Sequence, residues 1–201
     1  MKLNLFRDFI ISHITIPQLS EKIQGICKDV DGMCSPETLE ILNYAVSNCL
    51  EKDEQYLEIG TWLGRTAICA TLDNTSRAIV IDPLTFDNSS IVCPANIARY
   101  DHDKRIRLIV NMWQNVIRTE SWPLIGIHFF DGDHGDLSTL TAFEAWLPFC
   151  SQECLLIADD ICMDPVRRDI KLFRDKYKDN IVFEYETKFG MGQYIIGFKS
   201  K

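Results

Sequence analysis

From residue 55 onward, the sequence alternates short, nearly continuous apolar runs with segments of helical periodicity. The apolar runs lie at 55–60, 77–82, 105–110, 125–131 and 154–160. The helical segments lie at 64–72, 95–100, 115–120, 137–147 and 166–177. Apolar strands that alternate with helices are typical of a parallel sheet that is covered on both faces and joined by right-handed crossovers. The alternation predicts an α/β, Rossmann-like, doubly wound domain.

The two ends of the chain depart from this alternation. Two further strand-like runs, 180–187 and 192–199, are separated only by "KFGMG", which is too short for a crossover helix and predicts an antiparallel hairpin. The sheet should therefore have seven strands, five parallel ones followed by the hairpin. Residues 1–52 predict a helical preamble in which Ser35 caps a helix that begins at Pro36. We expect residues 53–201 to form one globular ligand-binding unit.

Composition and charge exclude several classes of partner and location. The net charge is −8, and the Lys and Arg residues are scattered, so nucleic acid and anionic membranes are unexpected partners. No segment approaches 18 uninterrupted apolar residues, which predicts a soluble, cytoplasmic protein. The eight cysteines include no CxxC pair and fall largely in apolar segments, so we expect reduced core thiols.

The end of the first strand is the first place to look for a ligand, because open parallel sheets bind ligands at carboxyl strand ends where the strand order reverses. "YLEIGTWLGRTA" has Gly60 and Gly64 at a GxxxG spacing, without the middle glycine of GxGxxG. Asp82 ends the second strand, where an acid can accept the hydroxyls of an adenosine ribose. A turn without a ligand, and an aspartate that only caps a turn, remain the alternatives.

Two later strands also end in acids, in "FFDGDH" and "LLIADD". If these strands are neighbours, their ends lie about 5 Å apart, and Asp131, Asp159 and Asp160 converge. Two such charges at 4 Å repel by about 4 kcal/mol at an effective dielectric of 20, so the group needs a cation, a proton or an arginine. Oxygen ligands favour Mg²⁺, with Mn²⁺ or Ca²⁺ as alternatives. Ordinary strand-end acids are the competing interpretation.

In their order, "YLEIGTWLGRTA", "IVIDP", "FFDGDH" and "LLIADD" resemble the class I S-adenosylmethionine-dependent methyltransferases. The resemblance is nearest to the small metal-dependent O-methyltransferases, such as the catechol, caffeoyl-coenzyme A and natural-product sugar enzymes, and runs from about Gly32 to the final hairpin. It implies that S-adenosylmethionine is bound by residues at the ends of the first four strands, namely Glu58, Gly60, Thr61, Gly64, Asp82, Asn111, Trp113 and Asp131, with Gln114 as a further candidate beside the adenine.

The resemblance also implies a divalent cation held by Asp131, Asp159 and Asp160, where the last position is an asparagine in the catechol enzyme. His134 stands where that enzyme has the lysine that takes the substrate's proton, so we expect a general base there. A solvated turn histidine or a metal ligand are the alternatives for His134. Asp133 and Asp136 are expected to cap the following helix, and His128 is expected to be a core histidine with satisfied hydrogen bonds.

The sequence thus predicts methyl transfer from S-adenosylmethionine to a hydroxyl of a small molecule, assisted by a metal. The preamble, the loop-like segment 83–94 and the segment around "TKFGMG" should shape the acceptor pocket. The resemblance favours a homodimer formed through the helical N-terminus at 3–16. Competing functions are a nicotinamide-dependent oxidoreductase, which would need the missing GxGxxG, another reaction on the same scaffold, and an inactive cofactor-binding protein.

Overall fold

The structure is a computed structural model that describes residues 1–12, 19–119 and 121–201. The strands of its single sheet are β1 Glu54–Ile59, β2 Ala78–Asp82, β3 Ile106–Val110, β4 Leu124–Phe130, β5 Cys150–Ala158, β6 Ile181–Glu186 and β7 Tyr194–Lys199. The helices are α1 Leu3–Ser12, α2 Glu21–Asp29, α3 Pro36–Asn48, α4 Arg65–Ala70, α5 Ser89–Tyr100, α6 Trp113–Val116, α7 Ser138–Trp146 and α8 Asp164–Tyr177, with short 3₁₀ turns at Leu147–Phe149 and Lys178–Asn180.

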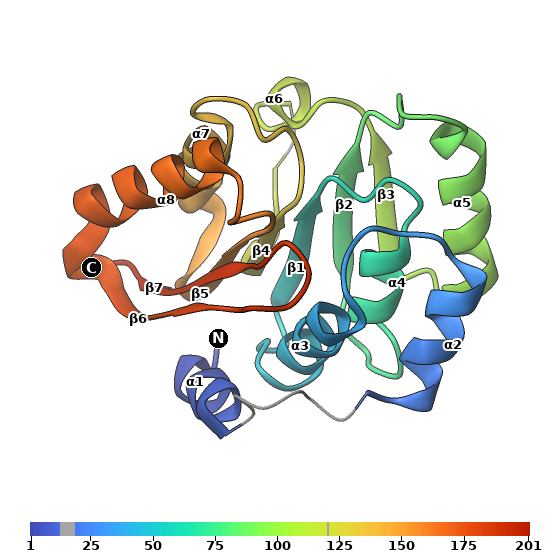
Figure 1. Ribbon diagram of the computed structural model, residues 1–201, viewed down its shortest axis with the longest axis horizontal. Helices are drawn as coiled ribbons and strands as arrows, with labels where there is room; N and C mark the ends of the chain where they lie inside the picture. The colour runs from blue at the N-terminus through green and yellow to red at the C-terminus, as the bar shows by residue number, and fades with distance from the viewer. Residues whose placement is uncertain (13–18, 120) are drawn as a thin grey trace.

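The sheet order is β3-β2-β1-β4-β5-β7-β6 (Figure 1). Strands β1 to β5 run parallel, and β7 pairs antiparallel with both β5 and β6. The predicted five parallel strands and terminal hairpin are confirmed. The order reverses between β1 and β4, so the carboxyl ends of these two strands form the switch point at which such sheets bind ligands.

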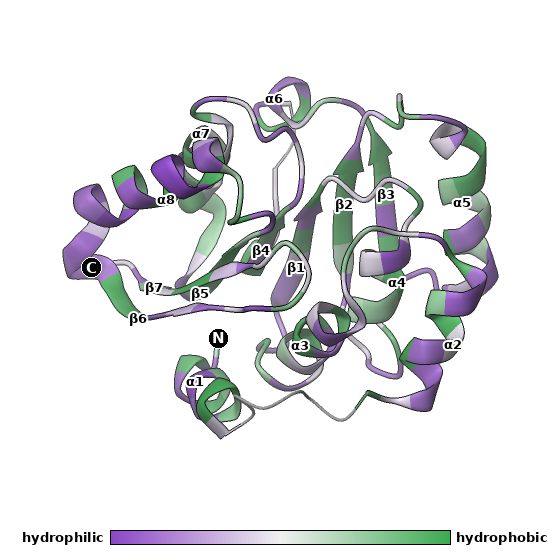
Figure 2. Cartoon of the chain, viewed as in Figure 1, coloured by the Kyte–Doolittle hydropathy of each residue, from purple (hydrophilic) through white to green (hydrophobic). Residues whose placement is uncertain are grey.

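Helices cover both faces of the sheet, because successive side chains on each strand point to opposite sides. On β1, Tyr56 belongs to the core under α1 to α5, and Leu57 belongs to the core under α6 to α8. Figure 1 shows α2 to α5 on one side of the sheet and α7 and α8 on the other, and Figure 2 shows the hydrophilic outer face of α8. The doubly wound architecture is therefore confirmed.

The N-terminal region is helical, as expected. Ser35 is the N-cap of α3 and accepts a hydrogen bond from the backbone N–H of Thr38 at 3.3 Å, with Pro36 in the first turn. Helices α1 to α3 contribute to the same core as the neighbouring sheet face, so a boundary at residue 52 stays a prediction. Part of the expected dimer segment 3–16, residues 13–16, lies outside the described residues. No described helix has the length and apolar character needed to cross a membrane.

The sequence predictions miss the start of α5 and the cap of α7. The segment 83–94 is only partly a loop, because α5 begins at Ser89 and buries Ser89, Cys93 and Ile97 at a spacing of four residues. The predicted helix at 115–120 is reduced to the four residues of α6; residue 120 is not described.

The prediction that Asp133 and Asp136 cap α7 is wrong. Asp169, which is fully buried on α8, accepts the backbone N–H groups of Leu137 and Leu140 at 3.2 and 3.3 Å. Asp136 instead pairs with an arginine of α8, and Asp133 accepts hydrogen bonds from the backbone N–H of Gly135 and from the side-chain hydroxyl of Ser138, not from a backbone N–H of α7. The cap of α7 therefore comes from a helix that is distant in sequence.

All eight cysteines are free. Five of them, Cys34, Cys49, Cys69, Cys93 and Cys154, are buried, in agreement with the prediction of core thiols. His128 is also buried in the core, but neither ring nitrogen has a hydrogen-bond partner within the described residues, so the expectation of satisfied bonds is wrong. Burial lowers the pKa of His128 to about 3, which keeps the ring neutral among its aromatic neighbours.

Candidate active site

The turn after β1 requires glycine at Gly60. Its φ is 86°, and a Cβ there would lie 2.0 Å from the backbone oxygen of Asp131, because β1 and β4 end side by side. Asp82, at the end of β2, accepts hydrogen bonds from the backbone N–H groups of Thr61 at 2.7 Å and Trp62 at 3.0 Å. The carboxyl ends of β1, β2 and β4 therefore lie side by side and form one surface.

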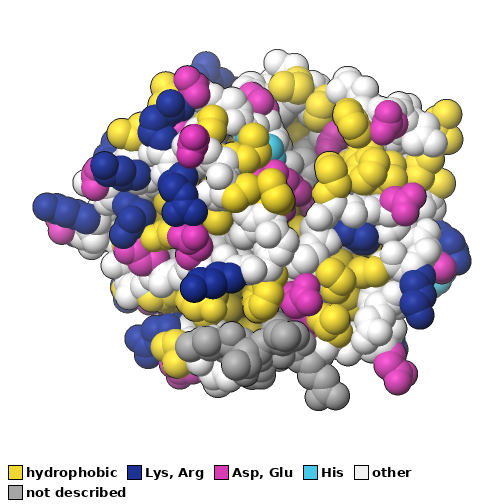
Figure 3. Space-filling model, in the orientation of Figure 1, with side chains coloured by type: hydrophobic (Ala, Val, Ile, Leu, Met, Phe, Trp, Pro, Cys, Tyr) yellow, Lys and Arg dark blue, Asp and Glu magenta, His cyan; other side chains and the backbone are white. Residues whose placement is uncertain are grey.

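A cavity of about 780 Å³ opens at this surface. Its lining includes most of the predicted site residues, namely Gly60, Thr61, Asp82, Asn111, Trp113, Gln114, Asp131, His134, Asp159 and Asp160. The space-filling view shows a hollow in which a histidine and acidic side chains lie between hydrophobic ones (Figure 3). The preamble contributes residues 32–35, the loop after β2 contributes Phe86, and the β6–β7 connection contributes Met191, so all three segments expected to shape the pocket do line it.

Asp131, His134 and Asp160 form what we call the strand-end cluster. His134 Nε2 lies 3.0 Å from Asp160 Oδ2 and 3.7 Å from Asp131 Oδ1, while its Nδ1 is buried and has no partner within the described residues. Burial raises the pKa of Asp131 well above its usual range, and the charges of Asp159 and Asp160 raise it further. One potential ligand atom from each member lies within 4.8 Å of the others, so the cluster could hold a metal ion.

Asp159 stands apart from the strand-end cluster. Its Oδ1 accepts hydrogen bonds from Gln193 Nε2 at 2.6 Å and from the backbone N–H of Asp160 at 2.9 Å, and its Oδ2 accepts one from Cys34 Sγ at 3.4 Å. Burial raises its pKa as well. A hard divalent cation prefers oxygen ligands, and Asp131 and Asp160 can supply them more readily than Asp159, whose oxygens already accept hydrogen bonds.

Glu58 and Gly64, two of the residues expected to bind the cofactor, lie outside the cavity lining. Glu58 is fully buried beneath it and accepts hydrogen bonds from Tyr56 Oη at 2.6 Å and from Thr66 Oγ1. Burial raises its pKa to about 7, against the lowering effect of its hydrogen bonds. Glu58 therefore presents no surface to a ligand in the cavity.

The polar lining residues that sequence reasoning missed include Cys34, Arg65 and Gln193. Arg65 follows Gly64 directly, and this position, a charged residue next to the glycine turn, is the sequence signal for it. Gln193 offered no local signal, because its contact with Asp159 joins the residue before β7 to the residue after β5 across 34 residues of sequence.

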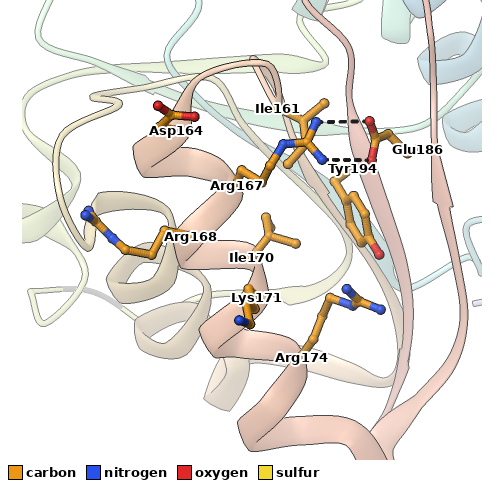
Figure 4. A pocket seen from close by; sticks show the side chains of 9 residues that line it. All are labelled: Ile161, Asp164, Arg167, Arg168, Ile170, Lys171, Arg174, Glu186 and Tyr194. Atoms are coloured by element: carbon orange, nitrogen blue, oxygen red, sulfur yellow. Dashed lines mark hydrogen bonds and ion pairs between the residues drawn. The ribbon is translucent and has the colours of Figure 1, made fainter.

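A second hollow, of about 440 Å³, lies between α8 and the β6–β7 hairpin (Figure 4). Three of its four cationic side chains already have carboxylate partners: Arg167 pairs with Glu186, Arg174 with Glu184, and Arg168 with an aspartate. The fourth, Lys171, lies on the same helix. Since the described residues that line this hollow include no histidine and none of the predicted site residues, the cavity at the switch point is the candidate active site.

Fold and site together define an α/β protein with a ligand cavity at the switch point of a seven-stranded sheet. A family model described as a methyltransferase domain matches residues 57–161, more than half of the chain, and the protein belongs to this methyltransferase family. A search of curated proteins found no match.

Solved structures share the fold over nearly the whole chain. The chain is similar to an O-methyltransferase of Bacillus cereus in complex with S-adenosylhomocysteine (TM-score 0.71, 16% identity, 96% of each chain covered). It is also similar to the O-methyltransferase TomG of Streptomyces achromogenes, involved in tomaymycin synthesis, in complex with S-adenosylmethionine (0.66, 14%, 98% of this chain and 96% of that one). A methyltransferase of Geobacter sulfurreducens aligns with a TM-score of 0.64 at 18% identity, over 98% of this chain and 96% of that one. The resemblance that the motifs indicated is confirmed at the level of family and fold.

Proposed function

We propose that this protein transfers a methyl group from S-adenosylmethionine to a hydroxyl group of a small molecule. The observation that carries the proposal is the placement of His134, which lies at 3.0 Å from Asp160 in the wall of the switch-point cavity, with Nδ1 unpartnered within the described residues. A methyltransferase that acts on oxygen needs such a proton acceptor, because a neutral hydroxyl is a weak nucleophile.

The cofactor would lie along the ends of β1, β2 and β3. Asp82 Oδ1 accepts one backbone N–H, from Leu84 at 2.6 Å, and a carboxylate oxygen has two lone pairs, so one remains for a ribose hydroxyl. Asn111, Trp113 and Gln114 line the adjacent part of the cavity and would contact the adenine. Gly60 and Thr61 would contact the methionine end, with Glu58 and Gly64 supporting the turn from beneath.

His134 would act as the general base. If Nε2–H donates to Asp160, Nδ1 of the neutral ring is the free acceptor, and a rotation of the side chain would bring this buried atom to the proton of the substrate hydroxyl. The oxygen would form a bond to the methyl carbon as the bond from carbon to sulfur breaks, the sulfur would keep that electron pair and become a neutral thioether, and the proton would move to His134. Asp160 would stabilise the imidazolium so formed.

Asp131 and Asp160 would hold a divalent cation, for which Mg²⁺ is our first choice, and Asp159 would support Asp160 through the hydrogen bond from its backbone N–H. When bound, such a cation supplies a lowered pKa for a coordinated hydroxyl. In the alternative arrangement, His134 is itself a ligand of the cation. A homodimer and a cytoplasmic location stay predictions.

The test is calorimetric titration of S-adenosylhomocysteine, first with chelator and then with Mg²⁺. We expect binding that Asp82→Ala weakens strongly, and a Mg²⁺-dependent heat that Asp131→Asn removes. Asp136→Asn, an exposed aspartate of the same connection that pairs with α8, is the matched control and should behave as the wild type. Absence of binding in both conditions would overturn the proposal and turn the search to NAD(H).

A second measurement separates catalysis from binding. With an acceptor found by screening hydroxylated compounds, His134→Gln should lower kcat by about 100-fold or more while the affinity for S-adenosylhomocysteine changes little. Cofactor binding without turnover of any acceptor would favour the inactive cofactor-binding protein. Activity that His134→Gln leaves unchanged would mean that another group is the base.

A further inference from the structure

The charge of the switch-point cavity is strongly one-sided. Five aspartates line it, namely Asp82, Asp131, Asp133, Asp159 and Asp160. Arg65 is the single Lys or Arg side chain of the lining within the part of the chain that the structure describes. Any ligand that carries a carboxylate would be repelled by most of this wall, so Arg65 is the one side chain with a permanent charge that favours it.

Arg65 is held in place but keeps unused hydrogen-bond donors. Its side chain is buried, with the whole residue only 9% exposed, and Nη2 donates to the backbone oxygen of Cys34 at 2.5 Å. Nε is buried without a partner, and Nη1 has no hydrogen bond to any residue that the structure describes. A guanidinium has five N–H donors, and only one of those of Arg65 is engaged in a hydrogen bond within the part of the chain that the structure describes.

The surroundings keep this guanidinium in one position. A Cβ at Gly32 would lie 2.4 Å from Nε and 2.7 Å from Cζ of Arg65, so only a glycine lets the segment before α3 pack over the guanidinium. The hydrogen bond to Cys34 fixes the same segment from the other side. Because the side chain is already immobilised, a ligand that used its free donors would lose little side-chain entropy on binding.

The position of Arg65 indicates which part of a ligand it would meet. It begins α4, directly after the Gly60–Gly64 turn, where the proposed function puts the methionine end of the cofactor. Asp82 and Trp113, which would contact the nucleoside, come from β2 and the segment after β3 instead. The anionic group of the methionine end is its α-carboxylate.

We propose that Arg65 binds the α-carboxylate of the cofactor's methionine part and thereby selects the complete cofactor over analogues that lack this group. The inference rests on the proposed function, since it names a recognition contact for the same cofactor. Arg65 is a binding residue in this role and takes no part in the chemical step. Its hydrogen bond to Cys34 would at the same time close the segment 32–35 over the methionine end.

The experiment measures, by calorimetry, the affinities of three ligands for the wild type and for Arg65→Gln. The ligands are S-adenosylhomocysteine, its decarboxylated analogue, which keeps the amino group, and 5′-methylthioadenosine, which lacks the whole amino-acid part. For the wild type we expect S-adenosylhomocysteine to bind about 10- to 100-fold more tightly than the decarboxylated analogue, as is usual for a charge-assisted hydrogen bond. In Arg65→Gln this preference should shrink to within about threefold, with 5′-methylthioadenosine unaffected.

Arg105→Gln is the matched control, because Arg105 also donates to backbone oxygens, those of Thr71 and Asn74, but lies outside the cavity. It should keep the wild-type preference. If Arg65→Gln weakens all three ligands equally, Arg65 only shapes the segment 32–35, and the inference is overturned.

A wild type without preference for the carboxylate overturns the inference too, and this measurement needs no variant to fold. If the wild type binds none of the three ligands, the proposed function itself fails. Binding of all three with an Arg65-independent preference refutes only the inference.

Discussion

Glu58 should make the stability of this protein depend on pH in the direction opposite to that of most acidic residues. Its carboxyl group is fully buried, and burial raises its pKa from 4.5 to about 7. At 1.36 kcal/mol per pKa unit, this shift corresponds to about 3 kcal/mol of unfolding free energy. Between these two pKa values the folded protein holds a proton that the unfolded chain has released. The contribution is therefore fully present below about pH 4.5 and is lost as the pH rises through 7.

The substitution Glu58→Gln tests this reasoning. The amide is neutral at every pH and has nearly the same shape, and the hydroxyls of Tyr56 and Thr66 can rotate to keep hydrogen bonds with it. Urea unfolding from about pH 5 to about pH 8 should show that the wild type loses about 2 to 3 kcal/mol relative to the variant. Asp131 and Asp159 also have raised pKa values, but they are present in both proteins and cancel in the difference.

The control is Glu51→Gln, which replaces an exposed glutamate just before β1 and leaves the buried carboxyl in place. Its free energy of unfolding should follow the wild type across the whole range. Parallel pH profiles for the wild type and Glu58→Gln would refute the argument, because they would mean that Glu58 is solvated or that it keeps its charge through the hydrogen bonds it accepts.

Three further perturbations test the packing and the metal. Asp169→Ala should lower the unfolding free energy by about 1–2 kcal/mol in urea titrations, because two backbone N–H groups at the start of α7 lose their acceptor; an unchanged midpoint would mean that water replaces it. Gly197→Ala should cost about 1–3 kcal/mol, since its Cβ would lie 2.3 Å from the ring of Phe183, and Phe183→Leu in the same chain should recover part of the loss if that clash is the cause. Mg²⁺ should raise the Tm of the wild type but not that of Asp131→Asn; equal shifts would show that the ion binds elsewhere.

The fold could be predicted largely from the sequence, because its elements follow from local rules. Apolar runs of strand length separated by helical periodicity are sufficient to predict parallel strands, and a connection too short for a crossover helix predicts a hairpin. Ser35 before Pro36 marks the start of α3 in the same local way. The start of α5 was missed because the polar residues at 87–90 read as a loop, although Ser89 is buried in the folded chain.

The candidate site could be predicted in part. The acids and His134 lie at strand ends that the topology brings together, and the structure does bring Asp131, His134 and Asp160 within reach of one another. Which of two consecutive aspartates faces the cluster was beyond sequence reasoning. Asp160 has a positive φ of 56°, and this turn of the backbone directs it toward His134, while Asp159 stays in the wall with Gln193.

The succession of strands and helices, the glycine turn and the residue types at the strand ends can all be predicted from the amino-acid sequence, because each depends on neighbours in the chain or on a rule of chain connection. The polar group that each of those residues meets depends on the three-dimensional packing. Asp169 caps a helix from 32 residues away, and Arg65 is held by the segment that contains Gly32. Such contacts are set by how helices and strands pack across the core, where burial and the need for hydrogen-bond partners select one arrangement among many that the sequence pattern allows.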